Sequence, residues 1–137
     1  MKPVIQQERT GCAIASSAAI AGITYKKAKS VANDLGIYAD DSNLWSESKY
    51  ICRILAKLGF TVSNKKIPFK NWTSLPACAL LATKWHMDKG KPYWHWVVFV
   101  RKNNREYVLD SKNSLKTNKR TDFGRIKPKW YIKVNIK

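Results

Sequence analysis

The chain has 137 residues, 45% of them hydrophobic, which is enough to bury the core of one domain but too few for two well-formed ones. Its 26 lysine and arginine residues face only nine aspartate and glutamate residues, and the net charge of +17 predicts attraction to polyanions. The apolar run over residues 13–23 is about half as long as a membrane-spanning helix, so no membrane span is expected.

Three helices are predicted in the first half of the chain, each followed by a glycine that can adopt the left-handed conformation of a helix end. These glycines are Gly22, Gly36 and Gly59. We expect the first helix to begin near Cys12 with Thr10 as its cap, and the next two to begin after Thr24 and Ser46. Apolar residues at helical spacing predict that the second and third helices each bury one face.

After Gly59 the pattern changes to short runs that are typical of strands. The expected strands cover residues 60–67, 77–85, 94–101, 106–109 and 130–136. Turns are expected at residues 89–92 and 102–105, and a basic loop at residues 111–128. Helices followed by an antiparallel sheet make the predicted fold class α+β, with residues 1–137 as a single domain.

The first helix is expected to stay part of the folded protein. Only Lys2 is basic before Glu8, and the apolar run continues into Lys26 and Lys27, which is unlike a signal peptide. This favours a cytoplasmic location, with delivery outside the cell as an effector or toxin left open.

Three cysteines without paired spacing predict neither a disulfide framework nor a zinc site, so no metal or cofactor is expected. They are Cys12, Cys52 and Cys78. The last two lie among apolar residues and are expected to behave as small buried hydrophobic side chains.

The positive charge is spread along the chain rather than confined to a tail. From residue 101 onward, 12 basic and 3 acidic residues give a net charge of +9. Such a field attracts nucleic acid, anionic lipid or an acidic protein. The alternative is that the lysines only face water, because no nucleic-acid-binding motif accompanies the charge.

A histidine precedes Asn103-Asn104 and an aspartate follows them, at positions that a hairpin would bring together. In a two-residue turn, paired positions sum to 207, so Val97 lies opposite Asp110 and His95 is a diagonal neighbour of Asp110. Both side chains then point to the same face, and the carboxylate can orient the imidazole. A slip of one residue would turn Asp110 to the other face.

Cys12 stands where a helix would begin, and there the unpaired backbone N–H groups and the helix dipole stabilise a thiolate. Gly11 leaves the sulfur uncrowded. Gln6, six positions upstream, is far enough away for its amide to fold back beside the Cys12 N–H, so both could donate to an oxyanion. We therefore predict Cys12 as nucleophile, His95 as base, Asp110 as its orienting group and Gln6 as an oxyanion donor.

Each of these residues alone has a more ordinary explanation, such as a buried cysteine or a turn aspartate, and only their combination favours catalysis. The competing base, His86, follows the end of a predicted strand and is expected at the surface. Trp94 and Trp96 share the strand face opposite His95, where core packing is expected and base stacking is the alternative.

Five short motifs over residues 4–112 occur in the same order in a known family. They read Gln6, Cys12-Ala13, Leu58-Gly59-Phe60, His95-Trp96-Val97-Val98 and Leu109-Asp110. With them the chain resembles a compact papain-like cysteine peptidase, closest to the bacterial peptidases that process bacteriocins by removing double-glycine leaders. The resemblance implies a papain-like fold and a hydrolase, a thiol protease that acts on a peptide or protein substrate through a catalytic triad.

These residues predict acyl transfer through a thioester on Cys12. Water as acceptor would make the protein a peptidase or amidase, and an amine as acceptor a transamidase. Two alternatives stay open: a papain-fold toxin-like domain that acts on RNA or another polyanionic target, and a non-catalytic basic binding module.

Overall fold

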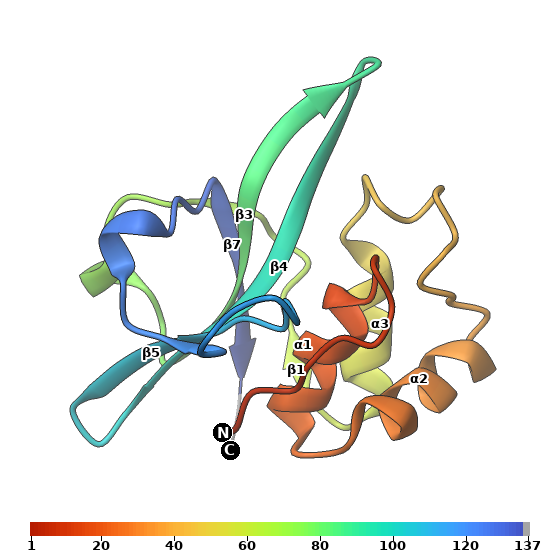
Figure 1. The fold of residues 1–137 in the computed structure, drawn as a ribbon, viewed down its shortest axis with the longest axis horizontal. Helices are drawn as coiled ribbons and strands as arrows, with labels where there is room; N and C mark the ends of the chain where they lie inside the picture. The colour runs from red at the N-terminus through yellow and green to blue at the C-terminus, as the bar shows by residue number, and fades with distance from the viewer. Residues whose placement is uncertain (136–137) are drawn as a thin grey trace.

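The computed structural model describes residues 1–135, in which three helices lie beside an antiparallel sheet (Figure 1). The helices are α1 (Cys12–Ala21), α2 (Tyr25–Asp34) and α3 (Lys49–Lys57). The strands are β1 (Thr61–Val62), β2 (Ile67–Pro68), β3 (Cys78–Asp88), β4 (Lys91–Lys102), β5 (Arg105–Leu109), β6 (Lys119–Arg120) and β7 (Trp130–Asn135). Two short 3₁₀ helices are η1 (Trp72–Ser74) and η2 (Phe123–Arg125). The predicted α+β class is confirmed.

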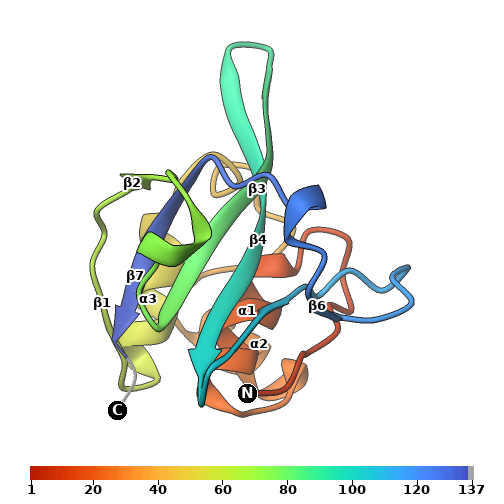
Figure 2. The same cartoon turned by 90° about the vertical axis from the view of Figure 1, so that its left-hand side faces the viewer.

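The strand order is β1-β7-β3-β4-β5-β6, with β2 also paired to β7, and every pairing is antiparallel. The last strand of the chain therefore lies between β1 and β3. The far ends of β3 and β4 form a two-stranded arm that projects from the body of the protein (Figure 2). No helix within residues 1–135 has the length and apolar character needed to cross a bilayer.

Apolar side chains cover both faces of the sheet. On one face, side chains such as Leu80, Val98 and Ile132 pack against α1 and α3. On the other, Val97 and Phe99 pack beneath η1, η2 and the segments around them. Helix α1 is buried along most of its length because its small alanine side chains let α2, α3 and the sheet approach it closely.

Each helix is followed by the glycine predicted to end it. Gly22, Gly36 and Gly59 have φ angles of 70°, 78° and 94°. Thr24 caps α2 by accepting a hydrogen bond from the Lys27 N–H at 3.1 Å, as expected.

Two predicted helix caps are wrong. Gly11, not Thr10, flanks the start of α1, and the Thr10 hydroxyl instead donates to the Ala39 carbonyl at 2.6 Å. Helix α3 begins at Lys49, later than the predicted start after Ser46. Ser48 flanks the start of α3, and its hydroxyl donates to the Asn64 side chain and does not cap the helix.

The strand boundaries also differ from the predictions. Residues 60–67 do not form one strand, because a polar stretch containing Asn64 separates β1 from β2 and the Asn64 side chain accepts a hydrogen bond from Ser48 at 3.2 Å. Strands β3 and β4 extend several residues into the arm. The predicted basic loop over residues 111–128 contains β6 and η2, and the predicted end of the last strand at Ile136 lies outside the described residues.

The hairpin of β4 and β5 has the predicted register. Lys102 pairs with Arg105 and Val98 with Leu109, so that paired numbers sum to 207. The two turn residues, Asn103 and Asn104, have φ angles of 55° and 62°, a left-handed pair that matches the twist of the strands. This turn sets the face on which Asp110 emerges.

Because a β-branched residue is strained in the left-handed conformation, we expect Asn104→Val to lower the free energy of unfolding by about 1–2 kcal/mol. Asn104→Gly is the matched control, since glycine adopts this conformation freely and should leave stability unchanged or slightly higher. Urea unfolding of the three proteins measures the difference. Equal stability of the valine and glycine variants would contradict the role given to the turn.

Candidate active site

His95 and Asp110 form the hydrogen bond that the hairpin register predicts. The imidazole Nε2 of His95, on β4, lies 2.8 Å from Oδ1 of Asp110, which directly follows β5. An ionised carboxylate only accepts hydrogen bonds, so Nε2 carries the proton that faces Asp110. The other ring nitrogen, Nδ1, is therefore left for a further partner.

The Asp110 carboxylate is 2% exposed and is held from several sides. Its Oδ1 also accepts the backbone N–H of Lys112 at 3.1 Å, and its Oδ2 accepts an N–H of Arg120 at 3.0 Å. Burial raises the pKa of Asp110. The hydrogen bonds from His95, the Lys112 backbone and Arg120, together with the charge of His95, lower it to about 2. The group therefore carries a stable negative charge beside the imidazole.

Arg120 was missed by the sequence analysis, which placed it in a basic loop. It lies on β6, opposite Val108 of β5, and its guanidinium reaches Asp110 on one side and Asp122 on the other. The two hydrogen bonds to Asp122 measure 2.9 Å and 2.7 Å. The presence of two acidic residues, Asp110 and Asp122, on either side of Arg120 in an otherwise basic segment was the available signal.

Cys12 is the first residue of α1 and lines a pocket together with His95. This pocket, called here the Cys12 pocket, has a volume of about 180 Å³. It is lined by Arg9, Thr10, Cys12, Trp45, Tyr50, Tyr93, Trp94, His95 and Trp96. Its walls are mostly aromatic, and of these only the tryptophans beside His95 were discussed from the sequence.

Contact with Cys12 and Asp110 changes the titration of His95. Burial lowers the pKa of the imidazole, but hydrogen bonding to Asp110 and to Cys12, together with their charges, raises it to about 9. With Nε2 held by Asp110, Nδ1 is the ring nitrogen left for a contact with Cys12. The structure thus brings Cys12, His95 and Asp110 together, and their catalytic roles stay a prediction.

Gln6 lies next to this group, but its amide has other partners. The side-chain N–H₂ donates to the carbonyls of Glu8 at 3.0 Å and Arg9 at 2.9 Å. Its Oε1 accepts the Ser111 hydroxyl at 2.7 Å, and its backbone N–H donates to the Ser111 carbonyl at 2.9 Å. Gln6 therefore ties the segment before Cys12 to the residue that follows Asp110, and its role as oxyanion donor stays a prediction.

Gly11 is required by close packing against α2. A methyl group at this position would overlap the Tyr25 hydroxyl and lie 3.2 Å from the Glu8 carbonyl oxygen. Tyr25 donates to the Glu8 carboxylate at 2.7 Å, and Glu8 also pairs with Lys29 at 3.3 Å. Burial and the neighbouring Glu8 raise the pKa of Tyr25, so its hydroxyl keeps its proton and fixes the turn that leads into Cys12.

The remaining cysteines and the second histidine lie outside this site. Cys78 is buried, as predicted, and burial raises the pKa of its thiol to about 12. Cys52 is only half-buried, so its prediction as a buried side chain is wrong; burial still raises the pKa of its thiol. His86 is exposed on the arm and contacts the Lys84 carbonyl at 2.9 Å, which confirms the predicted surface position.

Trp94 and Trp96 pack as expected against Trp130 of β7, with ring centroids 5.0 Å and 5.5 Å away. Trp96 is 1% exposed, and its indole N–H donates to the Tyr50 hydroxyl at 3.0 Å. The cluster fixes the part of β4 that carries His95, and two of its members, Trp94 and Trp96, line the Cys12 pocket.

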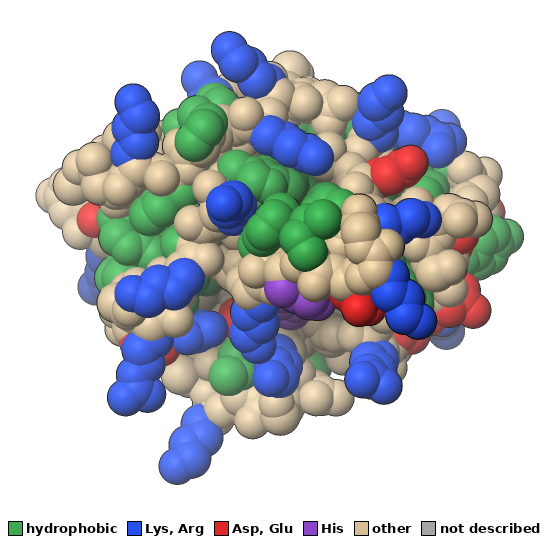
Figure 3. Space-filling model, turned by 90° about the horizontal axis from the view of Figure 1, so that it is seen from above, with side chains coloured by type: hydrophobic (Ala, Val, Ile, Leu, Met, Phe, Trp, Pro, Cys, Tyr) green, Lys and Arg blue, Asp and Glu red, His purple; other side chains and the backbone are tan. Residues whose placement is uncertain are grey.

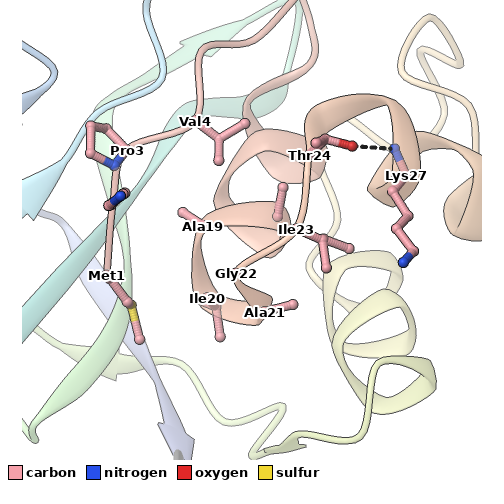
Figure 4. Close-up of a pocket in the computed structure, with 12 residues that line it drawn as sticks. Met1, Pro3, Val4, Ala19, Ile20, Ala21, Gly22, Ile23, Thr24 and Lys27 are labelled. Carbon is pink, nitrogen blue, oxygen red and sulfur yellow. Dashed lines mark hydrogen bonds between the residues drawn. The ribbon is translucent and has the colours of Figure 1, made fainter.

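A larger hollow of about 780 Å³ lies at the other end of α1 (Figure 4). Aliphatic side chains and backbone from residues 1–4 and 18–24 line most of it, and its charged side chains are Lys2 and Lys27. It contains no cysteine, histidine or carboxylate. The candidate chemistry is therefore assigned to the smaller Cys12 pocket.

Because the Tyr25 hydroxyl occupies the space beside Gly11, we expect Gly11→Ala to lower the free energy of unfolding by about 1–3 kcal/mol. Removing the hydroxyl by Tyr25→Phe should relieve part of this cost, so the glycine substitution should be less harmful in the Tyr25→Phe background. A double-mutant cycle measured by urea unfolding tests this. Strict additivity of the two substitutions would contradict the contact.

The pKa shifts predict how stability depends on pH. The pKa of His95 is raised to about 9, so its contribution is complete below about 6.5 and is lost as the pH rises through about 9. Asp110, with its pKa lowered to about 2, contributes fully above about 4, and this is lost as the pH falls through about 2. Relative to His95→Gln, the wild type should be most stabilised near pH 5–6, by up to about 3 kcal/mol. A constant difference between pH 5.5 and 9.5 would refute the pairing.

Comparison with protein-family models, with curated proteins and with solved structures finds no match for this chain. The case for a function therefore depends on the geometry around Cys12, His95 and Asp110 and on the sequence motifs that contain them.

Proposed function

We propose that the protein is a cysteine peptidase or amidase with a papain-like arrangement, in which Cys12 forms a thioester with the acyl group of a peptide or protein substrate. The carrying observation is the His95 Nε2–Asp110 Oδ1 hydrogen bond of 2.8 Å, with Cys12 and His95 lining the same pocket. A thiol, an imidazole and a buried carboxylate in line are the parts that nucleophilic acyl transfer needs. The nearby aromatic walls offer a surface for an apolar part of the substrate.

In the proposed reaction the Cys12 thiol gives its proton to Nδ1 of His95, and the sulfur attacks the substrate carbonyl carbon. The resulting imidazolium protonates the leaving nitrogen as the C–N bond breaks, which leaves a thioester on Cys12. Water then attacks the thioester while His95 takes one of its protons. Collapse of the second intermediate releases the acid and returns the proton to the sulfur.

Asp110 keeps His95 in the orientation that this proton transfer requires. Its Oδ1 accepts the Nε2 proton, and the Lys112 N–H and Arg120 hold the carboxylate in place. Its negative charge also stabilises the imidazolium that forms during the attack. Arg120 acts through Asp110 and is therefore a positioning residue.

The negative oxygen of each intermediate would face the start of α1. Backbone N–H groups in the first turn of a helix have no acceptor within the helix, and no side chain caps α1. The Cys12 N–H is the nearest of these donors to the attacking sulfur. The Gln6 side-chain amide donates to the carbonyl of Arg9, in the turn that leads into Cys12. If the amide released this carbonyl, it would add a second donor.

The chain differs from the resembled leader peptidases at the positions on either side of the nucleophile. Gly11 stands where they carry aspartate, and its place beside the Tyr25 hydroxyl has no room for that side chain. Ala13 stands where they carry glycine, and it packs in the core with 4% exposure. The difference at Ala13 therefore leaves the Cys12 pocket unobstructed.

Selective reactivity of Cys12 is the first test. With iodoacetamide at pH 6, we expect Cys12 to be alkylated well before Cys52 and Cys78, because only Cys12 shares a pocket with an imidazole. Peptide mapping by mass spectrometry measures the three rates, and His95→Gln is the control that should remove the preference. Equal rates at Cys12 and Cys52 in the wild type would argue against an activated thiol.

Hydrolysis of a mixed peptide library by the same proteins tests the activity itself. Cys12→Ala should abolish cleavage, and Asp110→Asn should lower the rate by about 10²–10⁴-fold while the protein stays folded. Wild-type activity should fall as the pH rises through about 9, where His95 loses the proton that the leaving group needs. Cleavage that persists in Cys12→Ala would disprove the proposal.

A further inference from the structure

Basic residues occur along the whole chain, but their excess over acidic residues lies after residue 48. Residues 1–48 contain 5 basic and 5 acidic residues, so they are neutral overall, and residues 49–137 carry the whole net charge of +17. These later residues include α3 and the entire sheet. Figure 3 shows one face of the molecule, on which lysine and arginine side chains far outnumber acidic ones.

Six of these cations line two neighbouring hollows at the free edge of the sheet, where β6 is the outermost strand. One of them, Arg120, pairs with Asp110 and Asp122. We call the other five the basic edge: Lys102, Arg105, Lys116, Lys119 and Arg125. One hollow has a volume of about 390 Å³ and the other about 340 Å³, and Lys119 lines both. The segment that carries β6, which pairs with β5, curves outward from the body of the protein in Figure 2.

The charges of the basic edge are not neutralised within the described residues. The carboxylates nearby have other partners: Glu106 pairs with Arg101, and both Asp110 and Asp122 pair with Arg120. The Lys119 ammonium lies 4.2 Å from the centre of the Tyr107 ring, which fixes it between the two hollows. All five side chains of the basic edge belong to exposed residues.

We propose that the basic edge binds the phosphodiester backbone of single-stranded nucleic acid. Two concave sites that share one lysine suit consecutive phosphates of a flexible strand, and such contacts draw their affinity from charge. An acidic protein would need apolar anchors in the interface, whereas the hollows offer mainly charged and polar side chains, with Leu115 half-buried and Tyr107 beneath Lys119. This inference does not depend on the activity of Cys12.

Binding of fluorescein-labelled 20-residue oligo-dT and oligo-U, followed by fluorescence anisotropy between 50 and 200 mM NaCl, tests the proposal. With five phosphate contacts, log K should fall with log salt at a slope of about −3.5. The variant Lys102→Gln/Arg105→Gln/Lys119→Gln removes three contacts, so its affinity should drop and its slope should flatten to about −1.4. Cys12→Ala should bind like the wild type.

The matched control is Lys26→Gln/Lys49→Gln/Lys57→Gln, which removes the same charge from exposed positions on the helices. It should lose far less affinity than the variant of the basic edge. Equal losses in the two triple variants would show general attraction to the whole molecule and overturn the assigned site. No binding at 50 mM NaCl, or tighter binding of polyglutamate than of either oligonucleotide, would overturn the proposed ligand.

Discussion

A buried carboxylate, that of Asp110, is the point on which the candidate site depends. A charge that is 2% exposed is costly unless every oxygen is occupied, and here His95, the Lys112 N–H and Arg120 supply the donors. These partners come from β4, from the segment after β5 and from β6. The carboxylate thus connects three parts of the sheet edge while it orients the imidazole. Loss of any one partner would leave a buried charge with an unfilled hydrogen bond.

Contacts made by the N-terminal segment hold Cys12 in the same region as this carboxylate. Gln6 bonds to Ser111, which follows Asp110, and Tyr25 fills the space beside Gly11. The first contact joins residues 105 positions apart, and the second fixes the turn from which α1 begins. Helix α1 then buries its small side chains between the sheet and the other helices. The packing of α1 against the sheet therefore also places Cys12 near His95.

Local rules in the sequence were sufficient for some of this arrangement. A two-residue asparagine turn requires a single register, so the contact between His95 and Asp110 followed from counting along two strands. The glycines that end the helices were equally readable, because each needs a left-handed backbone. Arg120 and the partners of Gln6 could not be derived in this way. They depend on how β6 and the N-terminal segment return to Asp110, and no short-range pattern encodes that path; Thr10 failed as a cap for the same reason, since its partner is the distant Ala39.

The three cysteines are unpaired thiols, and they separate the response of the fold to oxidants from that of the site. No covalent cross-link within residues 1–135 holds the chain together, so a change from reducing to oxidising surroundings removes nothing that the core needs. Cys12, by contrast, lines an open pocket beside a cationic imidazole, an environment in which thiols are readily converted to sulfenic acid. Mild peroxide would therefore silence the chemistry proposed for Cys12 in a protein that remains folded, and a thiol reductant would restore it.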